Sequence, residues 1–267
     1  MEIITSTTGD GSLTAIFVHG FGCDSSDWQH QIKALSPFFR CITLDLPGHG
    51  GSGQVFPPTI AGMARAVNQL KDGLPGSMCV LIGHSLGAKI VREAYCQSPE
   101  RVQGVVLLDG RYYEGDTAVL VEQAKAEIET QGFRNFASRH FLALLSDSLD
   151  PVMREKALRR VDALDPDYAA KLYLDAVAWD KARGRDTLED LIVPLLVVQS
   201  TYVDSTSTRR SITHGITTPL IETALRFSPK SEVRYIDKAG HFPMLDQPKA
   251  VSDALLTFME DLVQEMV

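Results

Sequence analysis

The feature that most constrains the fold of this chain is an apolar run ending at Ile82, which breaks on a Gly-x-Ser-x-Gly pattern and resumes with helical character. A strand that turns into a helix within a few residues strains the residue at the apex, and small neighbours make that strain tolerable. Gly83 and Gly87 are such neighbours. They leave Ser85 projecting into a cleft toward which the new helix directs its N-terminus. The pattern therefore predicts a nucleophilic serine, with the Leu86 amide as an oxyanion donor.

Strand-like and helix-like segments alternate along most of the chain. Such alternation is typical of a mostly parallel sheet flanked by helices. With 267 residues, 44% of them hydrophobic, the chain can bury one large core of this kind. Strands are expected at residues 13–19, 40–46, 78–83, 102–108, 193–199 and 232–236, and helices at residues 26–35, 59–70, 86–97 and 250–263.

The segment between the strands that end at Leu108 and begin near Ile192 has a helical pattern instead. Helices are expected there at residues 117–131, 136–145, 151–163 and 167–182, with Asp147, Asp150 and Asp165 near helix starts. A helical insertion is the simplest account. We therefore expect residues 1–110 and 191–267 to form the α/β core, and residues 111–190 to form a helical cap over the cleft.

The charge of the chain limits its partners. The net charge of −8 and the absence of a Lys/Arg block argue against nucleic acid as a partner.

No uncharged apolar run approaches the ~20 residues that a membrane span needs, and the opening residues lack a signal-peptide pattern. The four cysteines form no CxxC or paired framework and are expected to be buried small hydrophobes. A cytoplasmic location without membrane association is the resulting expectation.

Four motifs, taken in order, resemble those of the α/β-hydrolase fold superfamily. They are His19-Gly20-Phe21-Gly22, the glycine-rich stretch from Asp45 to Ser52, the serine motif itself, and Gly240-His241-Phe242-Pro243 near the end. The resemblance covers the whole chain. It implies a mostly parallel sheet flanked by helices, a helical cap inserted after the sixth strand, and the catalytic order serine, acid, histidine.

A serine hydroxyl is a poor nucleophile at neutral pH and needs a base within hydrogen-bond reach. The resemblance assigns this role to His241. It also assigns the second oxyanion donor to the Phe21 amide, opposite the Leu86 amide. His84, which flanks the serine, is expected to have a structural role.

Two aspartates could orient His241 and stabilise its imidazolium. Most members of the superfamily carry the acid after the seventh strand, where Asp204 stands one residue later than the usual turn. A minority carry it after the sixth strand, where Asp109 follows the apolar run directly. Asp204 is favoured because its position is the commoner one in the superfamily, and Asp109 because it stands directly at the end of the strand. Both are therefore candidates.

These residues predict a serine hydrolase that cleaves a small-molecule carboxylic ester or lactone through an acyl-enzyme on Ser85, without a metal or organic cofactor. A serine at this turn argues against haloalkane dehalogenases and epoxide hydrolases, which use aspartate. The same fold leaves other functions open: a C–C hydrolase, an amidase or aminopeptidase, a cofactor-independent dioxygenase, or a hydrolase-like ligand receptor. Arg209 and Arg210 could meet an anionic substrate, although an exposed pair is the commoner arrangement.

Overall fold

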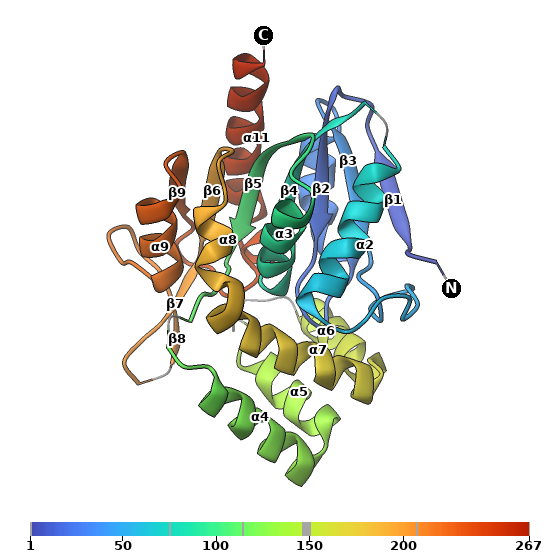
Figure 1. Cartoon of the computed structure of the whole chain (residues 1–267), viewed down its shortest axis with the longest axis vertical. Helices are drawn as coiled ribbons and strands as arrows, with labels where there is room; N and C mark the ends of the chain where they lie inside the picture. The colour runs from blue at the N-terminus through green and yellow to red at the C-terminus, as the bar shows by residue number, and fades with distance from the viewer. Residues whose placement is uncertain (1, 75, 114, 146–150, 207, 267) are drawn as a thin grey trace.

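The computed structural model describes residues 2–74, 76–113, 115–145, 151–206 and 208–266. Within them a seven-stranded sheet runs through the molecule in the order β1-β3-β2-β4-β5-β6-β9 (Figure 1). All neighbouring strands are parallel except β1 and β3, so the expectation of a mostly parallel sheet is confirmed. The strands are β1 (Thr5–Thr8), β2 (Leu13–Val18), β3 (Arg40–Leu44), β4 (Met78–His84), β5 (Val102–Leu108), β6 (Leu195–Gln199) and β9 (Ser231–Tyr235).

The two faces of the sheet carry separate hydrophobic clusters, as strand β2 illustrates. All six of its residues are buried, because helices cover both faces of the sheet. Side chains alternate along a strand, so Phe17 packs with Trp28 on one face, whereas Ile16 and Val18 join the other cluster. A continuous apolar run is therefore the expected pattern for such a strand.

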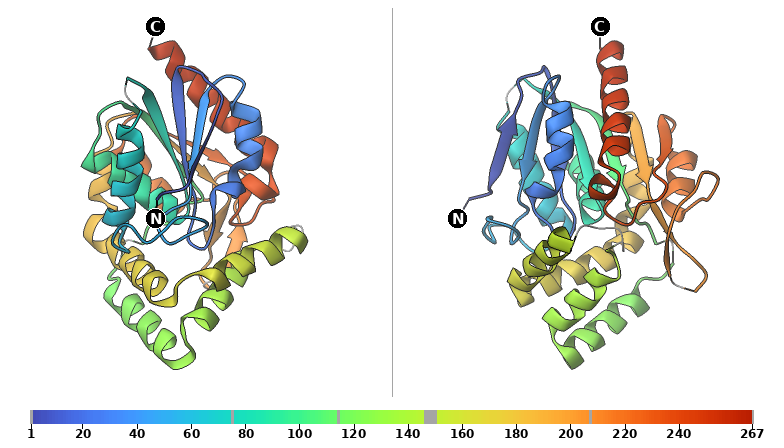
Figure 2. Two further views of the ribbon diagram at one scale, coloured as in Figure 1. Left: turned by 90° about the vertical axis from the view of Figure 1, so that its right-hand side faces the viewer. Right: turned by 180° about the vertical axis from the view of Figure 1, so that it is seen from behind.

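Helices cover both faces (Figure 2). Residues of α1 (Gln29–Leu35) and α11 (Pro248–Glu265) belong to the cluster that contains Phe17. The helices α2 (Ile60–Asp72), α3 (Leu86–Gln97), α8 (Asp186–Glu189) and α9 (Pro219–Phe227) contribute to the opposite cluster. A 3₁₀ turn, η1 (Ser25–Trp28), precedes α1, and the short α10 (Pro243–Asp246) precedes α11.

Strand β1 and the hairpin of β7 (Thr201–Val203) and β8 (Arg209–Ser211) were not among the strands expected from the sequence. Neither has the apolar pattern by which a strand is recognised in a sequence. All four residues of β1 are exposed and polar, so this edge strand has no buried face that an apolar repeat could indicate. The hairpin strands are three residues long, which is too short for a period to be read.

A helical insertion separates β5 from β6, as expected, and lies below the carboxyl ends of the strands in Figure 1. It comprises α4 (Ala118–Gln131), α5 (Phe133–Leu142), α6 (Pro151–Ala163), α7 (Pro166–Trp179) and a π-helical turn, η2 (Asp180–Gly184). The resemblance implied that the insertion follows the sixth strand. In the described part of the chain only four strands precede β5, so the insertion follows the fifth. Asp165 caps α7 by accepting from the Tyr168 N–H at 2.8 Å, whereas Asp147 and Asp150 lie outside the described residues.

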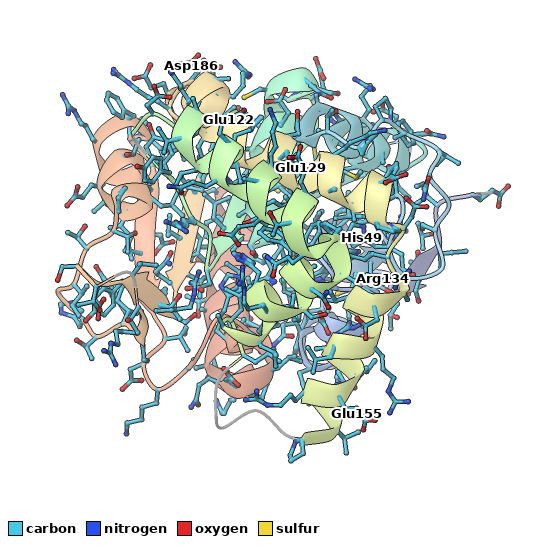
Figure 3. The ribbon with its side chains drawn as sticks, turned by 90° about the horizontal axis from the view of Figure 1, so that it is seen from below. His49, Glu122, Glu129, Arg134, Glu155 and Asp186 are labelled. Carbon is cyan, nitrogen blue, oxygen red and sulfur yellow. The ribbon has the colours of Figure 1, made fainter. Side chains whose placement is uncertain are left out.

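The outer face of the insertion is charged. Seen from below, it presents the exposed side chains Glu122 and Glu129 on α4, Arg134 on α5 and Glu155 on α6 (Figure 3). The inner face is tied to the core by Arg160, whose Nη2 lies 2.9 Å from Oδ1 of the fully buried Asp27. None of the described helices is long and apolar enough to cross a membrane.

All four cysteines are free thiols. Cys23, Cys41 and Cys79 are buried, as expected, while Cys96 is partly exposed late in α3. Burial raises the pKa of Cys41 to about 12 and that of Cys79 to about 11. Both thiols are therefore protonated at neutral pH, consistent with a packing role.

Candidate active site

Ser85 stands at the sharp turn between β4 and α3. Its backbone has φ 53° and ψ −111°, a region that non-glycine residues rarely occupy. A Cβ at position 83 would lie 2.2 Å from the Gly87 carbonyl oxygen, and a Cβ at position 87 would lie 2.2 Å from the Val18 carbonyl oxygen. Both positions therefore require glycine. The turn is the strained strand-to-helix connection that the sequence pattern predicts.

His241 connects Ser85 to a buried carboxylate. The loop after β9 carries this histidine, whose Nε2 lies 2.8 Å from Ser85 Oγ. Its Nδ1 lies 2.6 Å from Asp109 Oδ2. With the carboxylate accepting from Nδ1–H, the tautomer leaves Nε2 free to accept the serine proton. This chain of three groups has the geometry for transferring a proton from a hydroxyl to an imidazole.

Asp109 is held rigidly at the end of β5. Its backbone φ is 41°, so this residue too is strained, and its carboxylate is fully buried. Burial alone would raise the pKa of Asp109, but the hydrogen bond from His241, together with the charges of His241 and Arg209, lowers it to about 2. The carboxylate also accepts hydrogen bonds from the Ser200 and Thr201 amides, the Thr201 hydroxyl and the Gln199 side chain.

Asp204, the other candidate acid, is not brought to His241. It lies in the turn between β7 and β8, where its Oδ2 pairs with Arg210 Nε at 2.9 Å. Its Oδ1 accepts from the amides of Thr206 at 2.9 Å and Thr208 at 3.0 Å. This carboxylate closes the hairpin turn, as Asp commonly does through bonds to nearby backbone.

The environment of His241 favours the neutral imidazole. Burial lowers the pKa of His241, the positive charge of Arg209 lowers it further, and the hydrogen bond to Asp109 opposes them only in part. Arg209 Nη1 lies 3.4 Å from His241 Nδ1 and 3.5 Å from Asp109 Oδ2. From the sequence, Arg209 and Arg210 were candidates to meet an anionic substrate, with an exposed pair favoured. In the structure the side chain of Arg209 lines the site, whereas that of Arg210 does not.

The two amides expected to bind an oxyanion belong to residues that line one cavity together with Ser85. Leu86 is the first residue of α3, so its N–H has no partner within the helix. Phe21 follows Gly20 in the loop after β2. A Cβ at position 20 would lie 3.2 Å from Ser85 Cβ, so glycine allows this loop to approach the serine closely.

Two other histidines brace this arrangement. His19 Nδ1 donates to the Gly20 carbonyl at 2.8 Å, and its Nε2 accepts from the Leu46 amide at 2.9 Å. His84 Nε2 donates to the His241 carbonyl at 2.7 Å, and burial lowers the pKa of His84 to about 3. Both are neutral hydrogen-bonding groups. In the described part of the chain, no three His, Cys, Asp or Glu side chains converge as metal ligands would.

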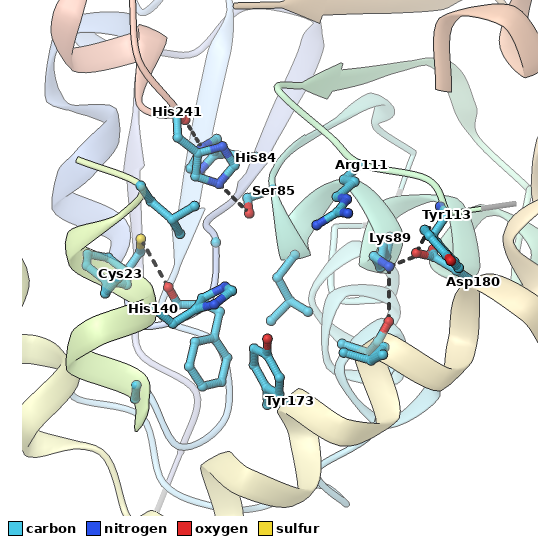
Figure 4. A pocket seen from close by; sticks show the side chains of 18 of the residues that line it. Cys23, His84, Ser85, Lys89, Arg111, Tyr113, His140, Tyr173, Asp180 and His241 are labelled. Atoms are coloured by element: carbon cyan, nitrogen blue, oxygen red, sulfur yellow. Dashed lines mark hydrogen bonds and ion pairs between the residues drawn. The ribbon is translucent and has the colours of Figure 1, made fainter. Parts of the chain in front are cut away.

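A cavity of about 180 Å³ lies between the serine turn and the helical insertion (Figure 4). Most of its wall is apolar, as is typical of sites for small molecules. The insertion contributes much of this wall through Leu120, Phe136, Phe141, Leu144, Tyr173 and Val177. The insertion therefore covers Ser85 and lines the space in front of it.

Polar side chains that the sequence analysis did not identify line the opposite part of the cavity. Lys89 lies one helical turn after Ser85, and its Nζ pairs with Asp180 Oδ1 at 2.6 Å. Burial lowers the pKa of Lys89 to about 8, although the charge of Asp180 opposes this. Arg111 follows the end of β5 closely. The helical spacing from Ser85 could have indicated Lys89, and the strand end could have indicated Arg111, whereas nothing local marks Asp180.

Comparison with known proteins agrees with this architecture. A family model described as alpha/beta hydrolase family matches residues 15–254. The chain is 26% identical over 263 residues to the dihydrolipoyllysine-residue acetyltransferase component of the acetoin cleaving system of Pseudomonas putida, covering 94% of this chain but only 64% of that protein. It is 26% identical over 267 residues to the pimeloyl-[acyl-carrier protein] methyl ester esterase of Edwardsiella ictaluri, covering 95% of this chain and 96% of the relative. A solved thermophilic esterase from Thermogutta terrifontis has the same fold, with a TM-score of 0.79, 24% identity, and coverage of 97% of this chain and 93% of that one.

Proposed function

The chain belongs to the alpha/beta hydrolase family, and from that premise we propose that it is a serine hydrolase of small-molecule carboxylic esters or lactones. The observation that carries the proposal is the hydrogen-bonded chain from Ser85 through His241 to Asp109 beside a mostly apolar cavity. Asp109 takes the role of the acid, because its carboxylate accepts from His241 while that of Asp204 accepts within its own hairpin.

The first half of the reaction acylates the serine. Ser85 Oγ attacks the ester carbonyl carbon while its proton moves to His241 Nε2. The carbonyl oxygen becomes negatively charged and accepts hydrogen bonds from the amides of Phe21 and Leu86. The bond from carbon to the alcohol oxygen then breaks, and the leaving oxygen takes the proton from His241. In a lactone, this alcohol remains attached to the acyl chain.

The second half of the reaction returns the enzyme to its starting state. A water molecule gives a proton to His241 Nε2 and attacks the acyl carbon. The bond to Ser85 Oγ breaks, and the serine recovers its proton from His241. One water is consumed. An ester releases one acid and one alcohol, and a lactone releases one hydroxy acid. Throughout, Asp109 holds the histidine in the required tautomer and stabilises its charged form.

The helical insertion serves as the cap in this proposal, with residues 111–190 as its extent. Its aromatic side chains supply an apolar surface for the acyl or alcohol group. The methyl ester named for the Edwardsiella ictaluri relative supports an ester rather than a C–C bond or an amide as the bond cleaved. The four free thiols support the cytoplasm as the proposed location.

Labelling with a fluorophosphonate tests the proposal. We expect one adduct per chain, on Ser85, and we expect Ser85→Ala to abolish both labelling and hydrolysis of a nitrophenyl butanoate ester. The matched control is Ser6→Ala, on the exposed strand β1, which should leave both unchanged. Hydrolysis that survives Ser85→Ala would contradict the proposal. If Ser85 is labelled but the unlabelled protein cleaves only one ester per chain, a ligand receptor would be favoured instead.

A further inference from the structure

We infer that the substrate carries, besides the ester, an ionised carboxylate that pairs with Arg111 in the cavity. This inference rests on the proposed function and names the substrate class. The charge of the cavity differs from that of the chain. The chain as a whole is acidic, at −8, yet among the described residues the cavity beside Ser85 is lined by three cationic side chains and a single carboxylate. The cations are Lys89, Arg111 and Arg209, and the carboxylate is Asp180.

Two of these cations already have acidic partners. Lys89 Nζ lies 2.6 Å from Asp180 Oδ1 and also donates to the Ala176 carbonyl at 3.0 Å. Arg209 Nη1 lies 3.5 Å from Asp109 Oδ2 and donates to the Thr201 hydroxyl. These pairs leave neither cation available as the principal partner of a ligand anion.

Arg111 differs from both. Among the described residues, no Asp or Glu forms an ion pair with its guanidinium. Its side chain points into the pocket, between Ser85 and Lys89, from the segment that follows β5 (Figure 4). Among the described residues of the site, Arg111 is therefore the one cation that no carboxylate compensates. A carboxylate brings one negative charge and two oxygens that match the guanidinium fork, whereas a phosphate monoester brings nearly two charges.

The position of Arg111 indicates that it binds a part of the substrate other than the reacting carbonyl. Arg111, Tyr113 and Arg209 line both the cavity beside Ser85 and a neighbouring cavity of about 220 Å³. The oxyanion of the reaction is served instead by amides next to Ser85. A carboxylate on Arg111 would thus lie at the junction of the two cavities, while the ester reaches the serine.

Arg111 is exposed to water in the free protein, and a neutral ester offers its guanidinium no charged partner. An ester with a carboxylate replaces that water by a charge-assisted hydrogen bond. We therefore expect the enzyme to discriminate between esters of equal size by their charge. Two matched pairs test both ends of the substrate: nitrophenyl glutarate monoester against nitrophenyl pentanoate, and carboxyphenyl butanoate against phenyl butanoate.

The measured quantity is the ratio of kcat/KM for the charged ester to that for the neutral ester. In the unaltered protein this ratio should exceed about ten for at least one pair, and Arg111→Gln should lower it about ten- to hundredfold. Arg111→Lys, which keeps the charge, should retain part of the preference. The matched control is Arg210→Gln, an exposed arginine that pairs with Asp204 outside the cavity and should leave the ratio within about twofold.

A binding measurement separates this inference from the proposed function. Ser85→Ala is titrated calorimetrically with monomethyl glutarate and with dimethyl glutarate, with and without Arg111→Gln. If no ester is hydrolysed but the monoester binds better in an Arg111-dependent way, the inference holds and the hydrolase proposal fails. If neutral and charged esters are hydrolysed alike, or if Arg111→Gln leaves the ratio and the binding preference unchanged, the inference is overturned.

Discussion

Asp109 Oδ2 lies 2.6 Å from His241 Nδ1, although 132 positions separate the two residues in the chain. The aspartate ends β5 and the histidine follows β9, and β6 lies between these strands in the sheet. The segment after β6 completes the contact, because the amides of Ser200 and Thr201 donate to the other oxygen of the carboxylate. Asp109 is therefore oriented both by the backbone that follows its neighbouring strand and by the histidine.

Asp109→Asn should lower kcat about ten thousandfold, as the corresponding change does in serine-protease triads. The Ser200 and Thr201 amides hold the oxygen of the new side chain, so its NH₂ group faces His241 and forces Nδ1 to accept. The proton then resides on Nε2, which can no longer receive one from Ser85. Asp204→Asn is the matched control, and kcat on nitrophenyl butanoate should stay within about twofold. A large loss in Asp204→Asn with none in Asp109→Asn would reverse our assignment of the acid.

The pH dependence of kcat/KM should have its acidic limb below the ordinary histidine pKa of about 6.5. His241 must be neutral to act as a base, and burial together with the charge of Arg209 lowers its pKa. Removing that charge favours the protonated imidazole, so Arg209→Gln should move the limb to higher pH. Arg210→Gln should not move it. A limb that stays in place in Arg209→Gln would show that Arg209 does not act on the titration of His241.

Gly83→Ala should destabilise the protein by about 1–3 kcal/mol and abolish fluorophosphonate labelling. The added Cβ would lie 2.2 Å from the Gly87 carbonyl oxygen, so β4 and α3 would have to separate at the serine turn. Gly73→Ala, at the end of α2, is the control. Its φ of −70° suits alanine and its nearest neighbouring atom would lie 3.3 Å away, so the change should cost less than about 1 kcal/mol. Urea denaturation measures both, and equal stability losses would argue against a special constraint at the turn.

Arg160→Gln should lower the free energy of unfolding by about 3 kcal/mol, because it leaves the fully buried Asp27 carboxylate without its cation. Arg159→Gln, on the same helix, removes an exposed pair with Glu155 and should change that free energy by less than about 0.5 kcal/mol. Guanidinium denaturation compares the two. If Asp27→Asn combined with Arg160→Gln restored none of the loss, the unpaired carboxylate would not be its cause.

Local sequence patterns predicted much of the sheet and its covering helices. The apolar runs of β2, β4 and β5 identify buried parallel strands, because a strand covered on both faces shows no polar alternation. The polar edge strand β1 escaped prediction for the opposite reason, since none of its four residues is buried. Within the insertion, helical periodicity predicted helices but not the π-helical turn that brings Asp180 to Lys89.

By itself, the sequence determined the strained turn at Ser85, since two glycines at fixed spacing are needed wherever a strand bends into a helix around a non-glycine apex. Only the tertiary structure shows that His241 contacts Asp109 and not Asp204, because both aspartates follow strands and their order along the chain does not say which one the histidine loop reaches. The same holds for the charge of the cavity. Lys89, Arg111, Asp180 and Arg209 come from four separate segments. Their pairing, which gives Arg111 no carboxylate partner among the described residues, is settled by where the folded chain brings each of them.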